Sequence, residues 1–449
     1  MKNLDDFFTE NTEKKAEKKD LKTGIAKVVE GSKADENERE KTSEVPQAAS
    51  FKFAHMADCH LGAFREKELR KLNLEAFERS LEACIERRVD FIVISGDLFH
   101  SASPDMEIAD RAVMIMKKVV DHGIKIYIVY GSHDCSANTK SLIDLLNTAG
   151  LFKKVVIIQA EEGFALETVI DGKTGVEIAG MSGRVGGLEK EYYENLRVDT
   201  KTENFKIFMF HSAIREMRPS YIPEEQSMSA SLLPEGFDYY AGGHVHERMA
   251  NTIDDKKIVF PGPLFGSNVR DLKKMEEEKR GFYVVSVVNG SEKKSEFVEI
   301  KVADVCTIDC DFDGMDSKEA NAILEKKCDK NVIDKIVVLQ AQGELKSGSV
   351  ADINIVKAKE KLVERGAKLV VPNTFGLTSL ERRSLTVKGS TKEEIEEKMF
   401  KEFFEGESPG AREFFRDLSI NAEDSGITRD NFEDYVSKKG YQFFGVEEG

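Results

Sequence analysis

From residue 51 onward, short runs of apolar and β-branched residues alternate with segments of helical spacing. The runs at 51–57, 91–95, 126–130, 207–210 and 239–241 have the length and composition of strands. Between the first two, apolar residues from Phe77 to Ile85 recur at the spacing of one helix face. This alternation predicts an α/β architecture over residues 51–300.

A second helix is predicted between the second and third runs. Ser103 and Pro104 suit an N-cap followed by the first helical position. Apolar residues continue at helical spacing from Ile108 to Val119, and Gly123 is expected to end the helix.

The residues after about 300 predict a second, smaller α/β domain, to which we assign residues 301–390. Strand-like runs at 302–312 and 333–340 alternate there with helical segments at 317–327 and 356–365. Residues 391–449 read as amphipathic helix, which suits packing either on a partner protein or on the chain's own core.

Residues 1–50 are rich in charged and hydroxyl side chains and poor in apolar ones, which predicts a disordered tail. Near its start, Leu4, Phe7 and Phe8 stand in Leu-x-x-Phe-Phe spacing. This spacing resembles the peptide by which replication and repair proteins bind the sliding clamp, although the usual leading Gln would fall at Met1. The alternative is an amphipathic turn without a partner.

Composition narrows the class of protein. The formal charge is −16, from 82 acidic and 66 basic residues, which argues against a uniformly basic nucleic-acid surface, so any DNA contact is local. No apolar stretch approaches the roughly 20 residues that span a bilayer, and the first residues lack a signal-peptide core, so we expect a cytoplasmic protein without membrane contact. The six cysteines form no CxxC pair, which argues against a disulfide framework or a structural zinc site.

Each of the five strand runs is followed at once by residue types that bind metals. These residues are Asp58 and His60, Asp97 and His100, Ser132 with His133 and Asp134, His211, and His244 with His246. They include six of the eight histidines, and the other two, His55 and His122, are expected to be structural. Because α/β sheets build their sites at the carboxyl ends of strands, we expect these side chains to converge.

A mixture of imidazoles and carboxylates suits borderline divalent ions such as Mn²⁺. A carboxylate shared by two ions, for which Asp97 is the natural candidate, would hold them roughly 3.5 to 4 Å apart, where both contact one phosphate. Paired ions lower the pKa of a bound water and neutralise the phosphate. The pattern therefore predicts a phosphoesterase with two divalent ions per chain.

This ordered set is similar to the signature of the calcineurin-like metallophosphoesterase superfamily. Within that superfamily, Gly-Asp-Leu-Phe-His-Ser-Ala-Ser-Pro at 96–104 resembles the DNA double-strand-break repair nucleases of the Mre-eleven/SbcD type. The resemblance implies a β-sandwich core flanked by helices at 51–300 and an α/β DNA-capping domain after it. It also implies a homodimer and an ABC-type ATPase partner of the SbcC/Rad-fifty kind.

Carried over by position, the resemblance implies two ion sites. The first would be formed by Asp58, His60, Asp97 and His246, and the second by Asp97, His211, His244 and Ser132. His133 would assist the leaving group and His100 would place the DNA phosphate. Asp134 would fix an imidazole rather than bind an ion.

The third motif departs from the superfamily, which usually has Gly-Asn-His where this chain has Gly131-Ser132-His133. Three outcomes stay open: Ser132 binds the ion directly, acts through a water, or leaves the second ion weakly held. We predict that the second ion binds more weakly than the first and that activity needs added Mn²⁺.

DNA contacts are harder to assign from sequence. Arg65, Lys67 and Lys71 follow the first motif, and Arg215 and Arg218 follow His211, so all five are candidate phosphate contacts or, alternatively, ordinary solvated charges. The leading hypothesis is a Mn²⁺-dependent DNA exonuclease and endonuclease of double-strand-break repair. The alternatives are a phosphodiesterase for a small nucleotide or diester, and a DNA-end tether with weakened catalysis.

Overall fold

The computed structural model describes residues 47–134, 141–155, 157–160, 163–183, 190–194, 196–198 and 200–380. The predicted clamp-binding residues Leu4, Phe7 and Phe8 and the predicted C-terminal segment at 391–449 lie outside these residues. Among the helices that are described, none is long and apolar enough to cross a bilayer.

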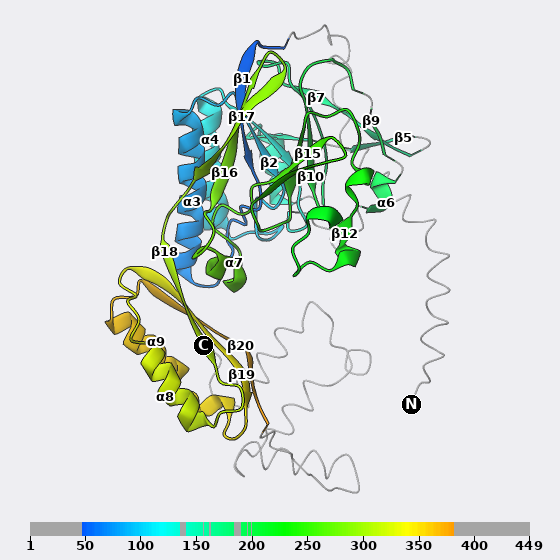
Figure 1. The fold of residues 1–449 in the computed structure, drawn as a ribbon. Helices are drawn as coiled ribbons and strands as arrows, with labels where there is room; N and C mark the ends of the chain where they lie inside the picture. The colour runs from blue at the N-terminus through cyan, green and yellow to red at the C-terminus, as the bar shows by residue number, and fades with distance from the viewer. Residues whose placement is uncertain are drawn as a thin grey trace, which may run out of the picture. The chain divides into compact units, whose positions relative to one another are not determined.

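The first of two six-stranded sheets contains three of the five predicted strands (Figure 1). Its order is β17 (Ser291–Glu299), β16 (Gly281–Val288), β1 (Ser50–Met56), β2 (Phe91–Ser95), β3 (Lys125–Val129) and β4 (Lys153–Lys154). Strands β1 to β4 are parallel, and β16 and β17 extend the sheet with antiparallel pairings beyond β1.

The second sheet contains the other two predicted strands. Its order is β14 (Met249–Ile253), β15 (Lys256–Phe260), β13 (Tyr239–Gly243), β10 (Lys206–His211), β8 (Glu177–Met181) and β7 (Val169–Ile170). The four inner strands are parallel, and the two edge strands pair antiparallel. The five predicted strand ends therefore belong to two sheets and not to one, which the short apolar runs alone could not distinguish.

Smaller elements complete this part of the chain. A three-stranded sheet contains β5 (Ile157–Ala160), β6 (Gly163–Leu166) and β9 (Leu196–Val198), and β11 (Ala213–Ile214) pairs with β12 (Ser227–Met228). The helices are α3 (Lys67–Glu86), α4 (Met106–Asp121), α5 (Leu142–Thr148), α6 (Lys190–Tyr193) and α7 (Val269–Lys274).

Strand β2 is buried along its whole length and β1 and β3 along most of theirs, which explains why these three strands are mainly apolar, whereas the edge strand β17 is largely exposed and polar. In β1, Ala54 and Met56 join a buried cluster that includes α3 and α4. Phe53 instead joins the cluster between the sheets, where its ring stacks on Phe91 at 5.4 Å and meets Tyr239 of the second sheet edge-on at 5.2 Å. The predicted β-sandwich core flanked by helices is confirmed.

Helix α4 begins later than predicted because Asp105, and not Ser103, is its N-cap. The Asp105 carboxylate accepts a hydrogen bond from the backbone N–H of Glu107 at 2.9 Å. A carboxylate at this position also interacts favourably with the helix dipole. The helix ends at Asp121, and Gly123 follows it with φ at 76°, in agreement with the prediction that this glycine ends it.

The chain after residue 300 continues with a three-stranded sheet in the order β18 (Asp304–Asp311), β19 (Lys335–Leu345) and β20 (Leu369–Ser379). Strands β18 and β19 are parallel and are connected through α8 (Ser317–Lys327), and α9 (Ile355–Glu364) connects β19 to β20. The predicted pattern of strands and helices is present here, whereas the domain bounds of 301–390 and their role in capping DNA stay predictions.

Candidate metal centre

The loop after β1 presents Asp58 and His60 from a strained backbone. Both residues have positive φ, 52° and 44°, and both side chains are buried. Their backbone N–H groups donate to the carbonyl oxygens of Gly96 and Asp97, at 3.1 and 2.9 Å. The loops after β1 and β2 are thereby held together, and strain of this kind is common at functional sites.

Asp97, which follows β2, lies among the other candidate ligands. Its Oδ1 accepts a hydrogen bond from the backbone N–H of His133 at 2.9 Å. Its Oδ2 lies 3.5 Å from Nε2 of His60 and 3.2 Å from Nε2 of His211. One carboxylate thus contacts histidines from both sheets, which is the position a bridging ligand needs.

Glycine is required where these loops approach one another. A Cβ on Gly131 would lie 2.0 Å from Oδ1 of Asp97, and one on Gly243 would lie 1.9 Å from the carbonyl oxygen of Ser95. Both distances are far below van der Waals contact, so any side chain at either position would displace the loop. The glycines of the predicted motifs therefore allow the ligand-bearing backbones to meet.

The second sheet contributes two histidines to this cluster of candidate ligands, His211 at the end of β10 and His244 directly after β13. His211 donates from Nδ1 to the carbonyl oxygen of Ser95 at 2.8 Å, which leaves its Nε2 directed at Asp97. The backbone N–H of His244 donates to Oδ1 of Asp58 at 2.9 Å, and the ring of His244 lies 5.3 Å from that of His211.

His246 also lies near Asp58. Its Nε2 is 3.0 Å from Nε2 of His60 and 4.0 Å from Oδ1 of Asp58. Its Nδ1 donates to Oδ2 of Asp271 at 2.8 Å. The ring is therefore oriented with Nε2 toward the cluster.

Three sets of side chains have potential ligand atoms within 4.8 Å of one another: Asp58 with His60 and His246, Asp58 with Asp97 and His211, and His60 with His100 and His133. In the part of the chain that the structure describes, the buried atoms Oδ2 of Asp58 and Nε2 of His211 have no hydrogen-bond partner. Buried polar atoms rarely lack a partner, so a bound cation fits this donor set. The first two sets share Asp58.

The pKa values of these groups have opposite shifts. Burial raises the pKa of Asp58 to about 6 and lowers that of His60 well below its usual range. Burial alone would lower the pKa of His211, but the negative charge of Asp97, 3.2 Å away, raises it to about 10. His211 and Asp97 thus form an ion pair in the absence of metal, and a divalent cation would take the place of the His211 proton.

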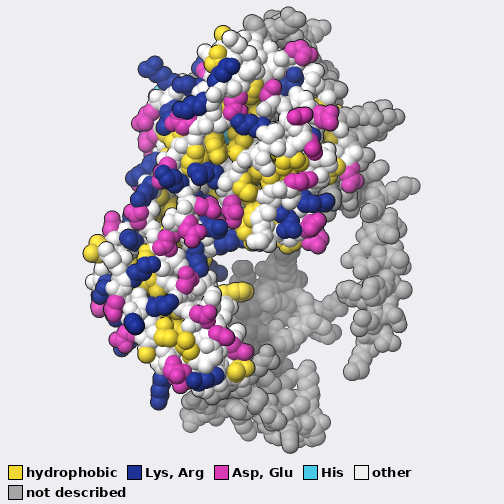
Figure 2. Space-filling model, viewed as in Figure 1, with side chains coloured by type: hydrophobic (Ala, Val, Ile, Leu, Met, Phe, Trp, Pro, Cys, Tyr) yellow, Lys and Arg dark blue, Asp and Glu magenta, His cyan; other side chains and the backbone are white. Residues whose placement is uncertain are grey.

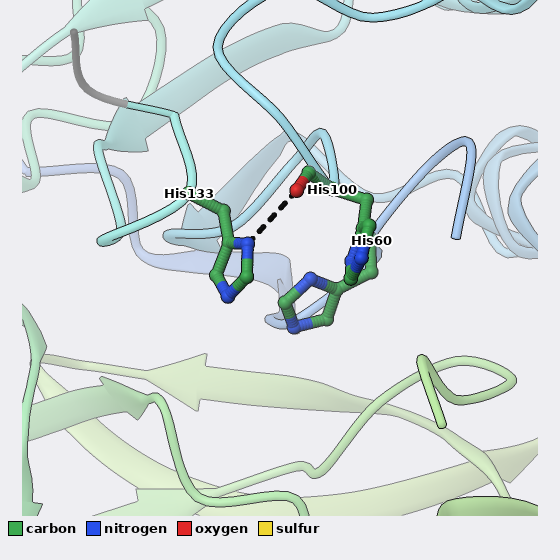
Figure 3. Close-up of side chains that lie close together, drawn as sticks. All are labelled: His60, His100 and His133. Carbon is green, nitrogen blue, oxygen red and sulfur yellow. Dashed lines mark hydrogen bonds between the residues drawn. The ribbon is translucent and has the colours of Figure 1, made fainter. Parts of the chain in front are cut away.

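His100 and His133 lie beside the cluster (Figure 3). Nδ1 of the exposed His133 donates to the carbonyl oxygen of the half-buried His100 at 2.8 Å, and the two rings stack 5.0 Å apart. The His133 ring is 4.9 Å from that of His60. The residues predicted to contact substrate are therefore brought next to those predicted to bind ions. Ser132, half-buried between Gly131 and His133, stays a predicted ligand.

Asp134 differs from expectation, because its carboxylate binds backbone and not an imidazole. It accepts the N–H groups of Leu98 at 3.2 Å and of Phe99 and Gly131 at 3.0 Å. These bonds join the loops after β2 and β3. Burial and then the charge of Asp97 raise the pKa of Asp134 to about 7.

The basic residues singled out from sequence fall into two groups. Arg65, Lys67 and Lys71 are exposed at the start of α3 and the loop before it. Arg215 and Arg218 lie 3.6 and 3.5 Å from the carboxylate of Glu224, and that neighbour partly neutralises them. The first group is thus the better placed to contact an anion.

Sequence reasoning missed Asp271 and Arg280. Asp271 lies in the first turn of α7, and Arg280 precedes β16. The N-cap residue Asn268 signals a helix start, but nothing in the sequence connects it with His246. The two histidines expected to be structural lie away from the ligand sets: His55 is buried within β1, and His122 caps the carboxyl end of α4.

The described residues thus form a sandwich of two sheets whose strand ends bring interleaved Asp and His side chains together. Residues 51–248 match the family described as calcineurin-like phosphoesterase. Over these residues the chain is therefore similar to calcineurin-like phosphoesterases.

Curated relatives extend the likeness. The chain is 30% identical over 249 residues to the DNA double-strand break repair protein Mre11 of Methanococcus maripaludis. The aligned region covers 52% of this chain and 62% of that relative. The chain is 29% identical to the Mre11 protein of Methanocaldococcus jannaschii, over 56% of this chain and 69% of that one. It is 26% identical to the uncharacterized metallophosphoesterase YhaO of Bacillus subtilis, over 53% of this chain and 58% of that protein. The match to the first of these spans less than two thirds of that relative's length.

Proposed function

We propose that this protein is a Mn²⁺-dependent nuclease that hydrolyses phosphodiester bonds of DNA, by exonuclease and endonuclease action, in double-strand-break repair. The observation that supports it most is Oδ2 of Asp97, which faces His60 of one loop and His211 of the other sheet. The archaeal relatives are DNA double-strand break repair proteins, which favours DNA as the substrate.

In this proposal the first ion is held by Asp58, His60, Asp97 and His246, and the second by Asp97, His211, His244 and Ser132. When bound, such a pair activates water and neutralises the charge of the phosphate. The short side chain of Ser132 makes the second position the weaker one.

The remaining residues act on the substrate. His133 already donates through Nδ1 to the carbonyl oxygen of His100, so a second proton, on Nε2, is available to the leaving oxygen when the ring is protonated. The His100 ring, stacked beside it, would position the phosphate.

DNA would be held by local contacts, because acidic and basic side chains are interspersed on the face of the molecule that Figure 2 shows. Arg65, Lys67 and Lys71 are the preferred phosphate contacts, since Arg215 and Arg218 face Glu224. A DNA-capping role for 301–390, a homodimer, an ABC-type ATPase partner of the SbcC/Rad-fifty kind and clamp binding through Leu4, Phe7 and Phe8 belong to the same proposal.

The test is hydrolysis of linear duplex DNA with Mn²⁺. Asp97→Asn keeps the size of the side chain but removes the shared charge, and we expect it to lower the rate by at least about 100-fold, which is more than the loss of a residue that only orients a ligand. Asp110→Asn alters an exposed carboxylate of α4 and serves as the control. An Asp97→Asn protein as active as the parent would contradict the proposal.

Ser132 favours one second candidate, a DNA-end tether with weakened catalysis. The same assay distinguishes the two, because a tether binds DNA ends without hydrolysing them at any Mn²⁺ concentration. A small-diester phosphodiesterase would instead cleave a chromogenic diester and leave DNA intact.

A further inference from the structure

We infer that Asp271 is a positioning residue of the metal centre, which fixes the ring of His246 and increases its strength as a ligand. The inference rests on the proposed ion site but not on the proposed substrate. Asp271 belongs to none of the sequence motifs and lies 25 residues beyond His246 in the chain.

The carboxylate of Asp271 is held by its own set of donors. Its side chain is almost fully buried, and Oδ2 accepts from Nδ1 of His246 at 2.8 Å. The same oxygen accepts from the backbone N–H of Ser267 at 2.9 Å and from its hydroxyl at 3.1 Å. Three donors on one oxygen stabilise the charged carboxylate and set its direction.

The backbone around Asp271 is fixed as firmly as its side chain. Its N–H donates to the side-chain oxygen of Asn268 at 3.1 Å, and its carbonyl oxygen accepts from Arg280 at 2.9 Å. Arg280, itself buried, also donates to the carbonyl oxygen of His246 at 3.1 Å. Arg280 therefore connects the backbones of the ligand and of its partner. A Cβ on Gly266 would lie 2.7 Å from Cβ of Asp271, which shows how closely this turn is packed.

This geometry determines the state of the His246 ring. Because Nδ1 donates to a carboxylate, the neutral ring has its lone pair on Nε2, which lies 3.0 Å from Nε2 of His60. A carboxylate behind an imidazole also increases its basicity, and loss of such partners typically lowers metal affinity about 10- to 100-fold.

The experiment is Mn²⁺ titration by calorimetry without DNA, on the full chain and on the variants Asp271→Asn and Asp271→Ala. Asn can keep the acceptor but not the charge, whereas Ala removes both. We expect the affinity of one ion position to fall in the order parent, Asn, Ala, by about 10-fold and then up to about 100-fold.

Asp171→Asn is the matched control. Asp171 is equally buried and accepts from Tyr127 and Thr174, at 2.8 Å in each case, but lies outside the ligand sets. We expect this control to lower the melting temperature of the metal-free protein and to leave Mn²⁺ affinity unchanged. If Ala does not fold, the Asn variant decides.

Equal Mn²⁺ affinity of parent and Asp271→Asn would overturn the inference and leave the proposed ion site standing. A parent that binds no Mn²⁺ would overturn the ion site and the inference together. Absence of DNA hydrolysis in a parent that binds Mn²⁺ would concern the proposed function alone.

Discussion

At the scale of single residues, the site depends on which ring nitrogen each histidine directs into it. His133, His211 and His246 each donate from Nδ1 to an oxygen, namely the carbonyl of His100, the carbonyl of Ser95 and the carboxylate of Asp271. In each ring Nε2 is the atom left for the site. The orientation of the rings is thus determined by hydrogen bonds outside the ligand set.

Asp134→Ala is expected to destabilise the protein strongly. The substitution would leave the buried N–H groups of Leu98, Phe99 and Gly131 without their acceptor, at a cost of about 3 kcal/mol or more in the free energy of unfolding. Chemical denaturation without metal measures this, with the exposed Asp110→Ala as control. A loss as small as that of the control would show that these bonds contribute little.

His55 should make the protein sensitive to mild acid. Burial lowers the pKa of His55 to about 3, from 6.5. Between these values the unfolded chain is protonated at this position and the folded chain is not, so stability falls as pH falls, by up to about 1.4 kcal/mol per pH unit. His55→Gln removes the titrating group.

The measurement is the free energy of unfolding of parent and His55→Gln from pH 7 to pH 4, with a chelator present. The advantage of the parent over the variant should shrink steadily below pH 6.5. Curves that stay parallel over this range would contradict a neutral, buried His55.

Residue types at the site were predictable from sequence, because Asp or His comes directly after each of the five apolar runs. Their hydrogen-bond partners were not. Ser95 contributes a backbone oxygen, which any residue could supply, and Asp271 looks like any acid in the first turn of a helix.

At the scale of elements, the loops after β1, β2 and β3 of one sheet meet the ends of β10 and β13 of the other. The sequence predicted five of the strands because these lie inside the two sheets, where they are mostly buried and mainly apolar. The apolar runs alone, without the family resemblance, could not predict that the strands form two sheets, since this depends on long-range packing such as that of Phe53 on Tyr239. The start of α4 was also misplaced, because two capping residues compete within three positions.

Gly131→Ala should disrupt the meeting of these loops. Its new methyl group would lie 2.0 Å from Oδ1 and 2.4 Å from the backbone nitrogen of Asp97, so either the loop or the carboxylate must move. We expect a loss of about 1 to 3 kcal/mol in stability and weaker Mn²⁺ binding by calorimetry. Gly172→Ala is the control, since its nearest neighbour would be the flexible end of Lys125 at 3.7 Å. Mn²⁺ affinity equal to the control's would contradict this account of the glycine.

At the scale of the whole molecule, bound ions should stabilise the fold, because the ligands come from segments that are far apart in the chain. A ligand that binds only the folded state stabilises it by about 2.7 kcal/mol when its free concentration is 100 times the dissociation constant. The melting temperature of the parent should therefore rise with added Mn²⁺ and return to its starting value with a chelator. Asp97→Asn should show little of this rise, and a rise equal to the parent's would place the ions elsewhere.

The net charge of −16 predicted that DNA contacts would be local, but net charge does not indicate which residues make them. Two strands and two helices after residue 300 were predictable from their spacing, with α8 at the predicted bounds, whereas β20 was not predicted. What this part of the chain does was accessible only through resemblance, because helical and strand periodicity is the same for any α/β domain.

The most direct test of the two-ion centre is a crystal structure with Mn²⁺, using anomalous scattering to locate the ions. We expect two peaks, one on either side of Asp97. The stronger should lie among Asp58, His60 and His246, and the weaker beside His211 and His244. Peaks that do not contact Asp97, or a single ion bound elsewhere, would contradict this expectation.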